Sequence, residues 1–125
     1  AHVHRVNPTG LESLIENATY QLWEVDRPRI RDATRRGVLS SRLHRINLTV
    51  RNLTEGRDPE RIAAKHPHVP ELLQKADEMK QHLQHWLVLP VDEMRVAVKA
   101  YLTLNEVPRV DYAQSSREAQ MYLSR

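Results

Sequence analysis

Apolar residues return every three or four positions along most of this 125-residue chain. This spacing places them on one side of an α-helix, because a helix completes a turn in about 3.6 residues. Prolines separate many of the segments, and the three glycines of the chain are fewer than a β-sandwich or barrel needs for its turns. The sequence therefore predicts an all-α fold, a single helical bundle of five to six amphipathic helices over residues 1–125.

Four apolar stripes predict the buried sides of four of these helices, and most of their members are Leu, Ile, Val, Met or Ala. The stripes are Leu11, Ile15, Ala18, Leu22 and Val25; Leu39, Leu43, Ile46, Val50 and Leu53; Leu72, Ala76, Met79, Leu83 and Trp86; and Met94, Ala97, Val98, Tyr101 and Leu104. A capping-box pattern, Thr9 with Glu12, opens the first of these helices.

Glycine and proline predict where the helices are interrupted. Gly37 is expected to mark a break or a tight crossing after a helical stretch over residues 27–36. A further short turn of helix is expected to start at Asp58. Residues 66–70, with two prolines, are expected to form a linker between two helical halves.

The two ends of the chain lack a complete pattern. Residues 1–8 show no apolar period, so we expect them to be poorly ordered. Asp111 can cap a last helix, whose stripe of Ala119, Tyr122 and Leu123 is cut off at the final residue. The interrupted stripe suggests that the chain is a piece of a longer protein.

Composition excludes several classes of protein. Without cysteine, the chain cannot form a disulfide framework or a cysteine-ligated metal site. No apolar run reaches the roughly 20 residues that a membrane-spanning helix needs. We therefore expect an intracellular protein, nuclear or cytoplasmic, that does not enter a membrane.

The charge of the chain is concentrated in one segment. Residues 27–51 contain eight arginines and one aspartate, a formal charge of +7, whereas the whole chain is only +3. Such a basic region attracts anionic partners, either an acidic-hydrophobic protein segment or nucleic acid. Alternatively, these arginines are ordinary solvated helix faces, partly neutralised by acidic helices of the same bundle. The candidate residues for electrostatic contact with a partner are Arg35, Arg42, Arg45 and Arg51.

A dense apolar run at residues 86–91 is the second candidate feature. It surrounds the end of a predicted helix, where it either forms core at a corner of the bundle or lines a groove for a partner segment. Trp86 and Leu89 are the candidates for apolar contact. No aromatic residue lies among the arginines of residues 27–51, which counts against nucleic acid, because many readers of single strands stack bases on aromatic rings.

Sequence motifs for metal binding or catalysis are weak or absent. His82 and His85 have a spacing that suits two zinc ligands, but no third ligand at a fixed spacing accompanies them. The sequence has no glycine-rich phosphate loop, nucleophile elbow or cysteine nucleophile. We therefore predict no catalytic residue, no metal and no cofactor.

Residues 41–46, Ser-Arg-Leu-His-Arg-Ile, followed by Val-Arg-Asn at 50–52, resemble the opening helix of the integrase-binding domain in the lens-epithelium-derived growth factor family. That domain belongs to a class similar to the N-terminal domain of transcription elongation factor TFIIS, and residues 92–107 loosely resemble its second helix. The resemblance implies a helical bundle that binds short linear motifs in transcription and chromatin complexes. It would make residues 57–90 an insertion, and the absence of Phe departs from the family, so no binding residue is carried over.

The sequence as a whole favours a non-enzymatic interaction module that binds an acidic or amphipathic segment of another protein. The first alternative is a helical nucleic-acid-binding domain that uses the arginines of residues 27–51. The second is a structural subunit of an oligomer.

Overall fold

In the computed structural model, the described residues are 10–55 and 67–109, and they form α-helices with no strand among them. The elements are α1 (Leu11–Gln21), the short 3₁₀ helix η2 (Leu22–Asp26), α2 (Asp32–Glu55), α4 (Val69–Leu87) and α5 (Val91–Leu104). The all-α prediction is confirmed. The number of helices differs, because the described residues contain four α-helices and one 3₁₀ helix rather than five to six helices.

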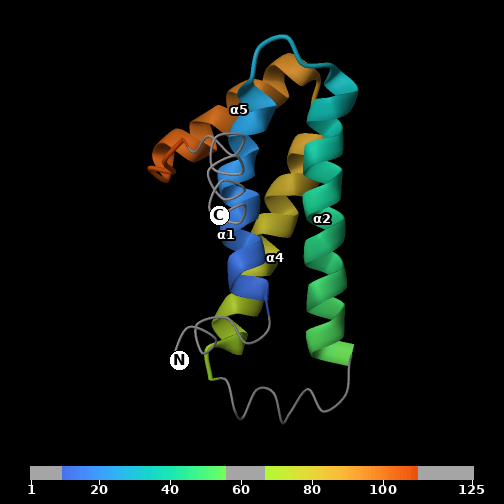
Figure 1. Cartoon of the computed structure of the whole chain (residues 1–125), viewed down its shortest axis with the longest axis vertical. Coiled ribbons are helices and arrows are strands. Elements are labelled where there is room, and N and C mark those ends of the chain that lie inside the picture. The colour runs from blue at the N-terminus through green and yellow to red at the C-terminus, as the bar shows by residue number, and fades with distance from the viewer. Residues whose placement is uncertain (1–9, 56–66, 110–125) are drawn as a thin grey trace, which may run out of the picture.

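Three long helices, α1, α2 and α4, lie side by side and contact one another in every pairing (Figure 1). Helix α5 crosses one end of this group, where it packs mainly on η2. Its C-terminal end points away from the three long helices (Figure 1). One side of α5 is therefore packed against the bundle, and the other is left at the surface.

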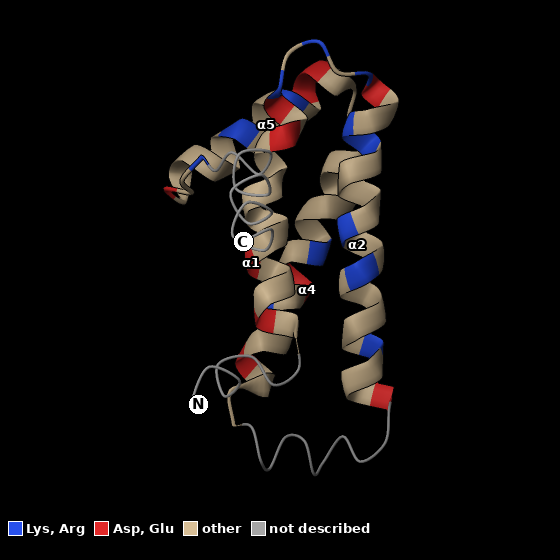
Figure 2. Ribbon diagram, in the orientation of Figure 1, with Lys and Arg blue, Asp and Glu red and all other residues tan. Residues whose placement is uncertain are grey.

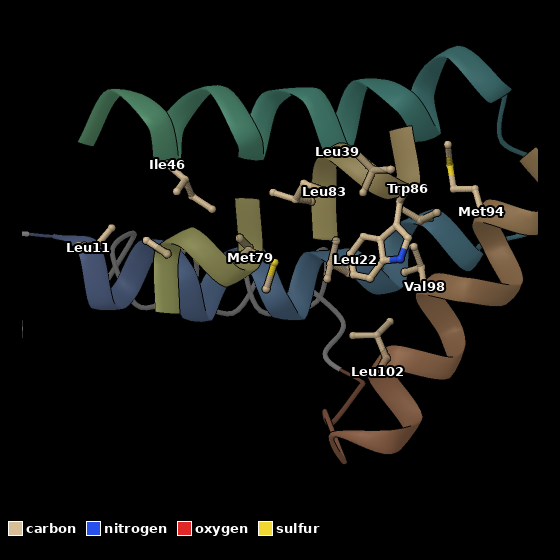
Figure 3. Close-up of a cluster of buried hydrophobic side chains, with 13 residues drawn as sticks. Leu11, Leu22, Leu39, Ile46, Met79, Leu83, Trp86, Met94, Val98 and Leu102 are labelled. Carbon is tan, nitrogen blue, oxygen red and sulfur yellow. The ribbon is translucent and has the colours of Figure 1, made fainter. Parts of the chain in front are cut away.

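Buried apolar side chains from every element form one continuous core (Figure 3). Its members are Leu11, Ala18, Leu22, Val25, Leu39, Ile46, Ala76, Met79, Leu83, Trp86, Met94, Val98 and Leu102. The stripes predicted for α1, α2 and α4 supply most of this set, and their remaining members are half-buried beside it. The stripe predicted for α5 is only partly right, because Leu102 is fully buried whereas Leu104 is 84% exposed.

The break predicted at Gly37 is wrong. Helix α2 has 24 residues and continues through Gly37, so residues 32–36 and the helix predicted after Gly37 are one element, whereas residues 27–31 precede it. A glycine inside a helix costs only about 1 kcal/mol relative to alanine. Burial of Leu39 and Ile46 on the same helix outweighs that cost.

The predicted linker at 66–70 is shorter than expected. Helix α4 already begins at Val69, and Pro70 lies in its first turn, where the missing N–H of proline is not needed. Val69 itself is buried. Gly10 is the N-cap residue before α1, and its φ of 77° suits glycine. Four predictions fall outside the described residues: poor order at 1–8, the cap at Thr9, the turn from Asp58 and the last helix from Asp111.

Candidate functional site

Arg35, predicted to contact a partner, is instead part of the interior. It is 6% exposed, and its Nε and Nη2 atoms donate hydrogen bonds to the carbonyl oxygens of Val25 at 2.9 Å and Arg27 at 2.7 Å. Its Nη1 atom also pairs with the Asp32 carboxylate at 3.3 Å. The guanidinium therefore satisfies carbonyl groups at the end of η2, and it is not available to a partner.

The neighbouring Arg36 has a similar structural role at the end of α4. Its Nη1 and Nη2 atoms donate to the carbonyl oxygens of Leu87 at 2.6 Å and Leu89 at 2.9 Å. A cation at the C-terminus of a helix is favourable because unsatisfied carbonyls give that end partial negative charge. Arg36 thus joins α2 to the corner between α4 and α5.

The other three arginines predicted to bind a partner do not all lie on one face of α2. Arg42 is half-buried, Arg45 is exposed, and Arg51 is exposed beside Glu55, with Nε and Oε2 3.9 Å apart. Arg42 and Arg51 are nine residues apart and lie on opposite sides of α2, because each residue turns a helix by about 100°. Figure 2 shows basic residues spaced along the whole of α2 rather than gathered in one patch.

Trp86, predicted to contact a partner, is also buried, with 3% of its surface exposed. Its ring stacks on His82 at a centroid distance of 5.4 Å and meets Tyr101 edge-on at 5.2 Å. His82 and Tyr101 are themselves 4.8 Å apart. These three rings join α4 to α5, so Trp86 stabilises the platform on which a binding surface can lie but is not itself that surface.

Leu89 is the one predicted contact residue that lies at an accessible apolar surface. It is half-buried and lines a shallow depression with Val96 and Ala97 of α5. The carboxylates of Asp92 and Glu93, in the first turn of α5, complete the lining.

Large apolar side chains are exposed on α5 and just before it. Val88, just beyond α4, is 79% exposed, and on α5 Val96 is 70% and Leu104 is 84% exposed. Leu48 on α2, at 49%, is the remaining large apolar side chain of this kind among the described residues. We use the name α5 outer surface for Leu89, Val96, Ala97, Ala100 and Leu104.

The opposite side of α5 is firmly attached. Met94, Val98 and Leu102 are fully buried, and Nη2 of Arg95 lies 3.2 Å from the carbonyl oxygen and 3.9 Å from the carboxylate of Asp26. The chain after α5 then returns to η2. There Arg109 lies 4.1 Å over the Trp23 ring and 3.5 Å from the Asp26 carboxylate.

Titratable side chains of the described residues form no metal-binding group, and one of them has a shifted pKa. Residues 10–55 and 67–109 contain no group of three His, Asp or Glu side chains that could hold a metal ion. Burial, together with the nearby Glu78 carboxylate, raises the pKa of the Tyr101 hydroxyl above its usual 10.0. Of the described helices, none is both long enough and apolar enough to cross a membrane.

The sequence did not indicate Val96 as a contact residue, and it predicted Leu104 as part of the buried stripe of α5. A signal was present, since apolar residues cover more than half of the circumference of α5 and some of them had to remain exposed.

Comparisons with protein families, with curated proteins and with solved structures each found no match to this chain.

Proposed function

We propose that this chain is a non-enzymatic protein-interaction domain whose binding surface is the α5 outer surface. The observation that carries the proposal is the exposure of Val96 at 70% and Leu104 at 84% on one helix, where Val96 also lines an apolar depression. Isolated apolar side chains are common on protein surfaces, but exposed apolar side chains that line a depression are typical of interaction sites.

The attachment of α5 supports the proposal. One side of this helix is held by buried apolar contacts and by Arg95, so the helix is a fixed platform. A fixed helix loses little conformational entropy on binding. The small side chains of Ala97 and Ala100 also let a partner helix approach closely between the larger Val96 and Leu104.

The arginines of residues 27–51 support partner binding less well than the sequence predicted. Two of them, Arg35 and Arg36, are engaged with carbonyl groups of the same chain. The proposed setting in a transcription or chromatin complex, and hence in the nucleus, depends on the resemblance of residues 41–52 and the looser resemblance of residues 92–107.

The proposal is tested with the double variant Val96→Ser, Leu104→Ser and the control Leu48→Ser. All three side chains are exposed, so each substitution should change the free energy of unfolding by less than about 0.5 kcal/mol. Each form is immobilised and incubated with native extract, and the retained proteins are quantified by mass spectrometry. We expect the double variant to lose proteins that the wild type and the control retain. Identical retained sets for all three forms would contradict the proposal.

A nucleic-acid-binding domain is the second candidate, favoured by the exposed side chains of Arg29, Arg31 and Arg45. Fluorescence anisotropy with labelled duplex DNA and single-stranded RNA tests it. A nucleic-acid binder should lose affinity steeply between about 50 and 200 mM salt, because binding releases counterions. Absence of binding at the lower concentration eliminates this candidate.

A further inference from the structure

The depression at the start of the α5 outer surface has an apolar floor and an acidic rim. Leu89, Val96 and Ala97 supply the apolar part, and the carboxylates of Asp92 and Glu93 supply the polar part. An apolar side chain of a partner can enter such a depression only if the groups beside it match the two carboxylates.

The rim carboxylates have no charged partner within the part of the chain that the structure describes. Every ion pair found among residues 10–55 and 67–109 involves other side chains, and neither Asp92 nor Glu93 takes part. The nearest cation along α5, Arg95, instead contacts Asp26. Arg95 and Lys99 line a second depression that shares Asp92 and Val96 with this one, so cations lie near Asp92 without forming an ion pair with it.

Asp92 and Glu93 both lie in the first turn of α5. Acidic residues at the start of a helix also stabilise that helix, but this effect does not explain the exposed Val96 beside them.

We propose that this depression binds a basic amphipathic segment of a partner protein. An apolar side chain of the segment packs against Leu89, Val96 and Ala97, while a neighbouring Arg or Lys pairs with Asp92 or Glu93. The inference rests on the proposed function and names its partner class. The predicted partner has the opposite charge to the acidic segment that the arginines of residues 27–51 suggest.

Two synthetic helical peptides of about 14 residues, the length of α5, serve as probes. Both carry the same leucine stripe; one has Lys and Arg at its polar positions, and the other has Glu. Binding of each labelled peptide is measured by fluorescence anisotropy at about 50 and 150 mM salt. The wild-type chain is compared with Asp92→Asn/Glu93→Gln, with Val96→Ser and with the control Leu48→Ser, after circular dichroism has shown that each is folded.

We expect the basic peptide to bind the wild type at least about threefold more tightly than the acidic peptide at low salt, and less so at higher salt. The Asn/Gln variant should lose this preference while it still binds both peptides. Val96→Ser should weaken binding of both peptides, and Leu48→Ser should change neither.

Equal or tighter binding of the acidic peptide overturns the inference, as does a preference that survives in the Asn/Gln variant. If binding depends on Val96 but not on peptide charge, only this inference fails and the proposed function stands. If binding of neither peptide depends on Val96, both fail. Sedimentation analysis gives the remaining outcome: a dimer of the wild type that Val96→Ser dissociates would make a second copy of the chain the occupant, and would overturn the inference.

Discussion

Replacement of Arg35 by Met should destabilise the chain more than replacement of any exposed arginine. Methionine keeps most of the length and apolar volume of the side chain but has no hydrogen-bond donor. The carbonyl oxygens of Val25 and Arg27, which accept bonds of 2.9 and 2.7 Å, would both lose their donor. Because Arg35 is only 6% exposed, little water is present to replace it.

The size of the effect follows from these two carbonyl groups. A buried polar group left without a partner costs about 1–3 kcal/mol, so the loss for two such groups should be about 2–6 kcal/mol. The contact with Asp32 adds little, since that carboxylate is 62% exposed. Arg35→Lys keeps the charge but can reach only one of the two carbonyls well, so it should cost about half as much.

Urea denaturation followed by circular dichroism and tryptophan fluorescence measures the free energy of unfolding of both variants. Arg45→Met is the matched control, because Arg45 is exposed on the same helix, and it should change stability by less than about 0.5 kcal/mol. If Arg35→Met is as stable as this control, the two carbonyl groups do not need the guanidinium and the argument for its structural role is refuted.

Three smaller predictions concern α2 and α5. Arg36→Ala should lower the free energy of unfolding by about 1–3 kcal/mol in the same denaturation assay, because two carbonyl groups at the end of α4 lose the guanidinium as their donor and either bind water or stay unpaired. An unchanged midpoint would contradict this. Gly37→Ala should stabilise by about 0.5–1 kcal/mol, since a Cβ there meets no atom within 4 Å and alanine favours the helix; a lower melting temperature would contradict it. The pKa of Tyr101 is raised by burial and by Glu78, so its contribution to stability is complete below the unfolded value of 10.0 and is lost as pH rises through the higher folded value. Tyr101→Phe should therefore lose less stability than the wild type above about pH 10, and equal losses in alkaline denaturation curves would refute this.

The core of the three long helices could be predicted well from spacing alone. Leu11, Ala18, Leu39 and Leu83 are all fully buried, and each belongs to a predicted stripe. Spacing succeeds here because α1, α2 and α4 each bury one side against the other two, so a single apolar stripe per helix is sufficient.

The buried side of helix α5 could not be predicted from apolar spacing in the same way. Its residues Met94, Ala97, Val98, Tyr101 and Leu104 follow a helical period, but so do Met94, Val98 and Leu102. The contact with η2 selects the second set, and it is a contact between segments about 75 residues apart. The sequence alone therefore could not identify the candidate site, because the residues of α5 that stay exposed depend on which side of the helix packs against η2.

The prediction at Gly37 failed because local preference is weak compared with packing. Glycine in a helix costs about 1 kcal/mol, whereas each buried leucine or isoleucine contributes about 2–3 kcal/mol. Leu39 and Ile46 alone exceed the cost of Gly37. A glycine in a helical stretch whose other residues include buried leucine or isoleucine is thus poor evidence for a break in the helix.

The charge of a segment and the charge of a surface are different quantities, and this chain separates them clearly. Residues 27–51 have a formal charge of +7, yet Arg35 and Arg36 use their guanidinium groups to satisfy carbonyl oxygens at the ends of η2 and α4. Their charge stabilises the fold at those helix ends, where the backbone is partly negative. Meanwhile Asp92 and Glu93 line an apolar depression on α5 and take part in no ion pair among the described residues, although the chain as a whole is basic.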